Sequence, residues 1–280
     1  MTVATTTTEQ SRPPSTLRPK WTVIVFMVIV HLGTLFALLP SNFSWAAVGV
    51  AVFLHWVTGC LGITLGWHRL IAHRSFQLPK FLEYFLVFCG SLTCQGGVID
   101  WVGLHRMHHL FSDQTEDPHD STLGFWWSHM LCWLYHLPAD QEVSRYTKDI
   151  GSDPVYQFFN KYFFPIQVAL GVLLYFLGGW PFVVWGIFVR MVVVFHCTWF
   201  VNSATHKFGY RTYETNDRSK NCWWVAVVTY GEGWHNNHHA FQYSARHGLQ
   251  WWEIDITWMT IRLLQALGLA QKVKLVNQED

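Results

Sequence analysis

The sequence is poor in charge: Asp, Glu, Lys and Arg make up 13% of its 280 residues, whereas soluble domains carry about 25%. Its formal net charge of +1 gives no electrostatic reason to expect nucleic acid as a partner. The six cysteines are scattered and form no CxxC pair, so we expect small buried side chains rather than a disulfide framework. What remains is a chain that is 51% hydrophobic and 17% aromatic, which indicates a lipid environment.

Four apolar segments are predicted to cross a bilayer, which takes about 20 residues in helical form. They cover residues 21–39, 45–65, 163–177 and 181–200. The connections "PSNFS" and "GGWP" are short and uncharged, which predicts tight helical hairpins on the far side of the membrane. Basic residues gather before the first segment and after the second and fourth, so both termini are expected in the cytoplasm.

The remaining chain is predicted to form a tail and a cap. Residues 1–20 are polar and rich in Thr and Pro, which indicates a disordered tail. Residues 21–280 are expected to form a single domain. Within it, residues 66–157 and 201–280 would make up a helical cap on the cytoplasmic side of the four spans.

Three stretches of the cap are apolar but too short or too amphipathic to be spans. Residues 81–94 and 124–137 are about 14 residues long and aromatic, so each is predicted to be a helix at the membrane interface. Residues 251–270 carry apolar side chains at helical spacing, which predicts an amphipathic helix packed on the cap or on the membrane surface.

Histidine is the main excess, with 16 residues, and the stretches "HRMHH" and "HNNHH" share the spacing HxxHH. On an α-helix, residues three and four apart share a face, whereas adjacent residues diverge by about 100°. Each box can therefore present ligands to two neighbouring metal ions. Nine of the histidines on the predicted cytoplasmic side lie in the boxes or just past the second and fourth spans: His68, His73, His105, His108, His109, His206, His235, His238 and His239.

His68 and His73 lie outside these two boxes, five residues apart. On an ideal α-helix that spacing corresponds to about 140°, so they too could serve different metals. The other seven histidines are expected to be hydrogen-bonded core or surface residues. They are His31, His55, His119, His129, His136, His196 and His247.

Nine imidazoles exceed the three or four ligands of a tetrahedral zinc site and suit two metals of higher coordination number. Two irons at a membrane surface can activate O₂, which predicts O₂-dependent oxidation of a lipid chain. A metal transporter would place its site near the bilayer midplane, but the boxes lie outside the predicted spans. A di-iron hydroxylase would share the boxes and stays open, and a membrane zinc hydrolase is disfavoured by ligand number.

The segments "HRLIAH", "HRMHH" and "HNNHH" resemble the three histidine boxes of membrane fatty acid desaturases. "GITLGWHRLIAHRSF", "DWVGLHRMHHLFSDQTEDPHDS", "WFVNSATHKFGYRTY" and "VVTYGEGWHNNHHAF" resemble the Δ9 branch, and the similarity covers roughly residues 20–270. It implies an all-α integral membrane fold, in which four transmembrane helices lie under a cytoplasmic cap with a kinked acyl tunnel. It also implies that the nine histidines ligate two irons and that Asn202 holds a metal-bound water.

The resemblance further implies that O₂ and two electrons from an external donor convert a saturated acyl chain to its cis-Δ9 alkene. Animal acyl-CoA desaturases carry an Arg-Asp pair before the second box, where this chain has Gly103 and Leu104. The basic pair they carry after the next helix is missing from "WLYHLPADQE". Because a nucleotide head with several phosphates favours such cations, these differences favour a chain esterified to a membrane lipid, with acyl-CoA as the alternative.

Cyanobacterial and plant-type acyl-lipid desaturases show this pattern and take their electrons from ferredoxin. The similarity thus implies ferredoxin or another external donor, and a bacterial, cyanobacterial-type plasma or thylakoid membrane. The oligomeric state is not predicted.

Carboxylates and tryptophans near the boxes complete the predicted site. Iron-bound histidines usually donate their other ring proton to a carboxylate or carbonyl. Glu232 and Asp100 are the leading acceptors, with Asp113, Glu116 and Asp117 as further candidates; a solvated acid is the alternative for each. Trp101, Trp199 and Trp234 flank the ligand segments and are interpreted as tunnel walls, with simple packing as the alternative.

Overall fold

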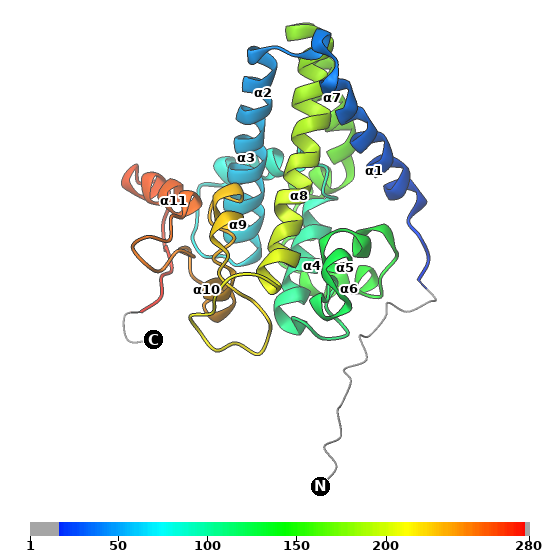
Figure 1. Cartoon of the computed structure of the whole chain (residues 1–280). Coiled ribbons are helices and arrows are strands. Elements are labelled where there is room, and N and C mark those ends of the chain that lie inside the picture. Colours follow the sequence, from blue (N-terminus) through cyan, green and yellow to red (C-terminus); the bar gives the residue numbers. More distant parts are fainter. Residues whose placement is uncertain (1–16, 278–280) are drawn as a thin grey trace.

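The structure is a computed structural model that describes residues 17–277 (Figure 1). Regular structure among these residues is helical, and β-pairing is confined to isolated bridges such as that between Pro19 and Tyr135. The long helices form a bundle, and the short helices gather around one end of it (Figure 1). The all-helical class predicted from the sequence is therefore confirmed.

The predicted disordered tail falls mostly on residues 1–16, which lie outside the described residues. Its last residues, however, are held by the loop before α6 (Ala139–Tyr146). The Lys20 amide donates to the Leu134 carbonyl over 2.7 Å, and the Lys20 ammonium lies 2.7 Å from Asp140. The prediction of disorder is wrong for these last residues, because backbone hydrogen bonds and an ion pair hold them in place.

Three long helices in the described chain are apolar enough to cross a membrane: Trp21–Leu38, Trp45–Ala72 and Pro154–His206. The first consists of α1 (Trp21–Thr34) and η1 (Leu35–Leu38), and the second of α2 (Trp45–His55) and the π-helix η3 (Trp56–Ala72). The third consists of α7 (Pro154–Val183), the π-helix η6 (Val184–Val189), α8 (Arg190–Ser203) and η7 (Ala204–His206).

The third of these helical stretches folds back on itself within "GGWP". Gly178 and Gly179 leave the helical conformation, and Gly179 has φ of 67°, a region that glycine enters without a Cβ clash. Beyond this point the chain runs antiparallel to α7: a Cβ at Gly171 would lie 3.7 Å from the Ile187 side chain, and further along the Gln167 amide lies 2.9 Å from the Met191 sulfur. The predicted segments 163–177 and 181–200 are therefore the two arms of one hairpin.

The connection "PSNFS" between the first two helices is also tight. It contains the turn η2 (Pro40–Asn42), and the Ser44 hydroxyl accepts from the Ala47 amide over 3.1 Å to cap α2. The helix that begins there does not end at residue 65 as predicted but continues to Ala72. This extension carries His68 within the same helix that forms part of the bundle.

The short helices gather around one end of the bundle, and we call this part of the molecule the cap. They are α3 (Lys80–Ser91), α4 (Val98–Phe111), η4 (Ser121–Leu123), α5 (Phe125–His129), η5 (Leu131–Leu134), α6, α9 (Trp223–Val228), α10 (His235–Ala240) and α11 (Ile256–Ala266). Arg106 of α4 donates to the Ile71 and Ala72 carbonyls over 2.9 and 3.1 Å. It thereby satisfies the last carbonyls of η3 and fixes α4 beside it.

Two of the three predicted cap helices form as expected. In α3, Phe81 and Phe85 are exposed while Leu86 and Val87 are buried, and in α11 Met259 is exposed while Ile261 is buried. Residues 124–137 instead form two short helices, α5 and η5, separated at Met130, whose φ of −144° is not helical. The break lets Trp127 and Cys132 both enter one apolar cluster with Met107.

Close approach between η3 and α3 depends on two glycines. A Cβ at Gly62 would lie 2.5 Å from the Gly90 backbone nitrogen, and Gly90 itself packs against the Trp67 ring. No side chain fits at either point, so η3 is held against the cap by backbone contact.

Replacing Gly62 by Ala should lower the free energy of unfolding by about 1–3 kcal/mol, because the methyl group would overpack against the α3 backbone. Gly49→Ala on α2 is the matched control, since a Cβ there meets nothing within 4 Å. The measurement is the melting temperature of detergent-purified protein. Equal melting temperatures for the two variants would contradict the close packing.

Candidate metal centre

The nine predicted histidines come together in two groups at the cap end of the bundle. Within each group, the ring nitrogens that face one another all lie within 4.8 Å. The first group consists of His68, His73, His105, His109 and His238, and the second of His108, His206, His235 and His239. Eight of the nine side chains come from four separate helical segments, and His73 directly follows η3.

His68 and His73 belong to the same group, which differs from the expectation that they serve different metals. The reason is the π-helical geometry of η3, in which the His73 amide donates to the His68 carbonyl over 3.1 Å. Hydrogen bonding from i to i+5 brings residues five apart onto the same face. The 140° separation expected from α-helical geometry therefore does not apply.

The two HxxHH boxes divide their histidines between the groups in opposite ways. His105 and His109 of α4, four residues apart, belong to the first group, whereas His108 belongs to the second. In α10, His235 and His239 belong to the second group and His238 to the first. Each box thus faces both groups, as the helical spacing predicts.

The Nε2 atoms within each group point at one another. His73 Nε2 lies 2.8 Å from His105 Nε2, and His109 Nε2 lies 2.9 Å from His238 Nε2. In the second group, the Nε2 atoms of His206 and His235 are 3.2 Å apart. Two nitrogens at right angles around an ion about 2.1 Å away would be about 3.0 Å apart, so these separations fit metal coordination.

Four of these histidines turn their other ring nitrogen toward a carboxylate. A carboxylate only accepts hydrogen bonds, so Nδ1 carries the proton and Nε2 of the neutral ring keeps its lone pair for a metal. The pairs are His68 with Glu232 (2.8 Å), His108 with Asp117 (3.0 Å), His206 with Asp113 (3.2 Å) and His239 with Asp217 (2.7 Å).

Burial favours the neutral form of most of these imidazoles, whereas Asp117 raises the pKa of His108 above the usual 6.5. Desolvation, together with neighbouring histidines, holds the pKa of His105, His109, His235 and His238 well below the usual 6.5. Burial alone would raise the pKa of Asp217, but the hydrogen bond from His239 lowers it below the usual value. Neutral rings backed by ionised carboxylates form a donor set that suits iron, copper, zinc or nickel.

Glu232 is the centre of a buried charge network. Arg69, which is fully buried, donates from Nε to Glu232 over 3.0 Å and from Nη1 to Asp255 over 2.9 Å. The other Glu232 oxygen faces both His68 and His247, at 2.8 and 3.0 Å. Asp255 also caps α11 by accepting from the Trp258 amide, so the network joins the first histidine group to the C-terminal helix.

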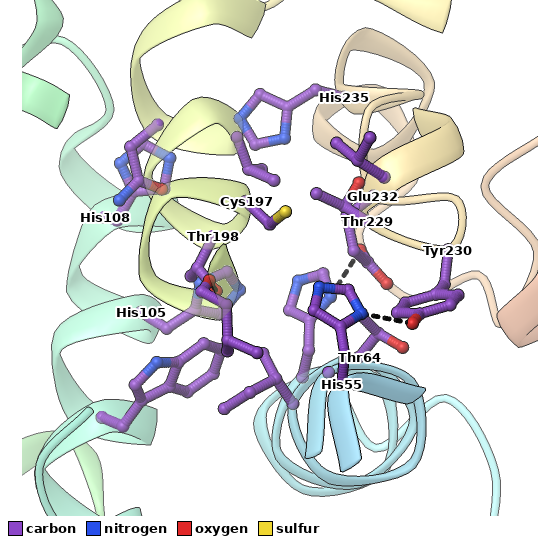
Figure 2. Close-up of a pocket in the computed structure, with 18 residues that line it drawn as sticks. His55, Thr64, His105, His108, Cys197, Thr198, Thr229, Tyr230, Glu232 and His235 are labelled. Atoms are coloured by element: carbon purple, nitrogen blue, oxygen red, sulfur yellow. Dashed lines mark hydrogen bonds and ion pairs between the residues drawn. The ribbon is translucent and has the colours of Figure 1, made fainter. Parts of the chain in front are cut away.

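A cavity lies beside both histidine groups. Its walls come from η3, α4, α8 and the segment 228–235, with His105 and His108 on one side and Tyr230 and Glu232 on the other (Figure 2). Trp101 lines it and stacks on His105, with ring centroids 5.2 Å apart. Asn202 also lines it.

The chain matches the model of the family described as "Fatty acid desaturase" over residues 43–264. The chain belongs to the fatty acid desaturase family. It is 65% identical over the full length of both chains to the sn-1 stearoyl-lipid 9-desaturase of Anabaena variabilis. It is 50% identical to the sn-2 palmitoyl-lipid 9-desaturase of Nostoc sp. (strain 36), over 91% of this chain and 90% of that one. An acyl-CoA 5-desaturase of Anemone leveillei, AL21, is 46% identical over 85% of this chain and 75% of its own.

Three residues of this desaturase that contact the histidine groups were not predicted as site residues: the half-buried Asp217 and the buried His247 and His119. Asp217 lies in a polar loop with no motif around it, so nothing in the sequence indicates its contact with His239. His247 packs on His238 with ring centroids 4.3 Å apart, and His119 packs on His108 at 4.1 Å. The histidine in "DPH" and that in "ARHG" lie outside the HxxHH pattern, which is why each was expected to be an ordinary core residue.

Two carboxylate predictions for the desaturase are wrong. Asp100, in the first turn of α4, accepts a hydrogen bond from the Asn160 side chain over 3.3 Å and contacts no histidine of either group among the described residues. It precedes His105 by five residues on an α-helix, so the two side chains point in different directions. Glu116 is exposed, whereas its neighbour Asp117 is buried against His108.

Two of the three predicted tunnel tryptophans do not line the cavity. Trp199 is buried in a cluster with Phe195 and Met191, and the Trp234 indole donates to the Ile254 carbonyl over 2.8 Å. Both belong to segments that carry ligands, but their side chains point to the opposite side of the helix or turn. Only Trp101 of the three lines the cavity.

Four of the remaining histidines of the desaturase are hydrogen-bonded core or partly exposed residues, as expected. His31, His196 and His129 form a chain that ends at the Ser203 hydroxyl, and His55 lies 2.5 Å from the Tyr230 hydroxyl. His136 is exposed. Arg190, buried within the bundle, donates to the Gly186 and Leu92 carbonyls over 3.0 and 2.5 Å.

Replacing Glu232 by Gln should reduce the metal content of the purified desaturase and lower its free energy of unfolding by about 3–5 kcal/mol. The substitution removes a buried negative charge and leaves Arg69 with Asp255 alone. Elemental analysis for iron and thermal melting measure the two effects. Glu116→Gln removes an exposed carboxylate and should change neither quantity; if both variants behave alike, the network has no such role.

Proposed function

We propose that this desaturase introduces a cis-Δ9 double bond into a saturated acyl chain esterified to a membrane glycerolipid. The observation that carries the proposal is the cavity that runs beside two groups of converging imidazole nitrogens. The sequence identity of 65% to an enzyme named as an sn-1 stearoyl-lipid 9-desaturase supports the substrate class and the position. The reaction breaks two C–H bonds and consumes two external electrons and two protons, while O₂ is reduced to two waters.

Nine histidines fit two iron ions, five histidines around one and four around the other. Iron bound there would supply the activation of O₂ that an unactivated C–H bond requires. Asn202 lines the cavity beside the second group, and we assign it the role of holding a metal-bound water. Asp113, Asp117, Asp217 and Glu232 hold the protons on Nδ1 and thereby fix the direction of each Nε2 lone pair.

Trp101 would position the acyl chain against the metals. Its indole stacks on His105 and packs edge-on against His68, so it presents a flat apolar wall next to two ligands. A chain lying along this wall would have its reacting carbons close to both groups.

The lipid-bound carrier is supported by the packing around Gly103. A Cβ there would lie 2.8 Å from the Val143 side chain of α6, and Leu104 belongs to the apolar cluster beneath it. The place where acyl-CoA enzymes are expected to carry a cationic pair is thus filled by helix packing. Purified protein offered galactolipid or acyl-CoA in separate assays would distinguish the two carriers.

The fold and the distribution of charge support a proposed topology. The helices Trp21–Leu38 and Trp45–Ala72 and the two arms of the Pro154–His206 hairpin would give four spans. Both histidine groups lie on the cap side, which we place in the cytoplasm with both termini. Ferredoxin or another external carrier would supply the electrons, and a cyanobacterial-type plasma or thylakoid membrane is the proposed location.

Expression in a desaturase-deficient host should produce cis-Δ9 acyl chains in the membrane lipids, and His108→Ala or His238→Ala should reduce them by at least about a hundredfold, since each variant removes one ligand. His136→Ala, an exposed histidine outside both groups, should retain activity. Gas chromatography with mapping of the double-bond position measures the products. Retained activity in both ligand variants would refute the metal role, and hydroxylated products would favour the hydroxylase alternative.

Trp101→Ala should shift the position of the double bond or the preferred chain length, because it removes the apolar wall beside His105. Trp199→Ala should lower the amount of folded protein without changing the product profile, because Trp199 packs away from the cavity. Products are compared per amount of purified protein. The assignment fails if Trp199→Ala alters the product profile and Trp101→Ala does not.

A further inference from the structure

One surface segment of the chain reaches the second histidine group directly. It consists of residues 207–221, which connect η7 to the turn before α9 and lie at the end of the molecule opposite the α1–α2 connection (Figure 1). Asp217 faces His239 Nδ1 at 2.7 Å. The next residue, Arg218, donates its backbone amide to Asp113 over 2.6 Å, and the same Asp113 oxygen faces His206 at 3.2 Å.

Two consecutive residues of this segment therefore reach two ligand histidines: Asp217 contacts His239 directly, and Arg218 contacts His206 through Asp113. Of the four carboxylates that face ligand histidines, Asp217 has the most exposed side chain, at 10%, compared with 6% for Asp113, 7% for Glu232 and 1% for Asp117. A covalent and hydrogen-bonded path from the surface to two ligands of the second group thus passes through Asp217 and the Arg218 backbone.

The segment is held in one shape rather than left as a loose loop. The Asn236 side chain, fully buried between two ligands in "HNNHH", accepts from the Thr212 and Tyr213 amides over 2.7 and 2.8 Å. The Arg211 guanidinium donates to the Thr215 and Asp217 carbonyls, each over 2.8 Å. A surface fixed in this way loses little conformational entropy when a partner binds.

Its outer face is predominantly positive. Lys207, Arg211 and Arg218 are exposed and Lys220 is partly exposed, whereas Glu214 is the exposed acid of the segment. Asp217 has its carboxylate turned to His239. This excess of cations stands out in a chain whose formal net charge is only +1. It would steer a negatively charged protein to this place on the cytoplasmic face.

We propose that residues 207–221 are the docking surface for an acidic one-electron carrier protein, and that electrons enter the centre through the second histidine group. The inference rests on the proposed function, because desaturation needs two electrons per double bond. A one-electron carrier would dock twice per turnover and leave oxidised by one electron each time. The two electrons, two protons and the two hydrogens of the substrate together reduce O₂ to two waters.

The test compares the double variant Lys207→Glu/Arg218→Glu with Arg145→Glu, each as full-length, iron-loaded protein in lipid nanodiscs. Neither side chain of the double variant holds the segment in shape: the Lys207 ammonium lies over the Phe125 and Phe208 rings, and Arg218 uses its backbone amide. Arg145 is an exposed cation of the cap, 71% exposed on α6, whose reversal is a matched change of charge elsewhere.

The first readout is direct binding of an acidic [2Fe–2S] ferredoxin, measured as Kd over a range of salt concentrations. The double variant should bind at least about tenfold more weakly at low salt, with the difference shrinking as salt rises. Arg145→Glu should bind like the unmodified protein. Equal weakening by both variants, or by neither, would overturn the docking surface.

The second readout separates docking from chemistry. With ferredoxin as donor, the double variant should show a raised KM for ferredoxin, whereas a single turnover of chemically pre-reduced protein should give an unchanged yield of alkene. A yield that falls in the double variant would mean that the segment acts on the centre itself, contrary to the proposal. If pre-reduced unmodified protein forms no alkene, the proposed function fails, whatever the binding measurements show.

Discussion

Nine imidazole Nε2 atoms converge in two groups at hydrogen-bond distance, and lone pairs that point at one another repel unless a proton or a cation lies between them. The rest of the structure is arranged to maintain this convergence. Carboxylates face Nδ1 of four rings and leave Nε2 free, burial lowers the pKa of most of the rings, and four helical segments that are distant in sequence meet at one place. A metal pair held in this way is what a membrane enzyme needs to oxidise an unactivated hydrocarbon with O₂.

The helices set the direction of each ligand. In η3, π-helical hydrogen bonding brings His68 and His73 to one face, and in α4 and α10 the α-helical period divides each box between the two groups. The asparagines between the histidines of "HNNHH" complete this arrangement. Asn237, buried at 2% exposure, donates to Glu253 and to the His247 carbonyl over 2.8 and 2.9 Å, which anchors α10 to the C-terminal part of the cap.

The buried charges explain how the cap and the bundle act as one unit. Arg69 lies on the helix that continues from the bundle, Glu232 precedes α10, and Asp255 begins α11. Removing one partner from such a buried site would leave the others as uncompensated buried charges. The network therefore links the first histidine group to the segments that precede α10 and α11. The second group is tied instead to the surface segment 207–221, which gives the two groups different surroundings. One is linked to the C-terminal helix through Arg69 and Asp255, and the other to a surface segment through Asp217.

The sequence by itself determined the apolar helices, the two HxxHH boxes and the identity of the nine converging histidines, because helical periodicity and composition are local properties. It also indicated Glu232, which lies three residues from His235. Only the tertiary structure decided which histidine belongs to which group, that Asp217 rather than Asp100 faces a ligand, and that Trp101 alone of three tryptophans lines the cavity. Those facts depend on how η3 winds, where the loop after η7 returns and which side of a helix meets its neighbour. Long-range packing determines these three features, and the local sequence around each residue does not encode them.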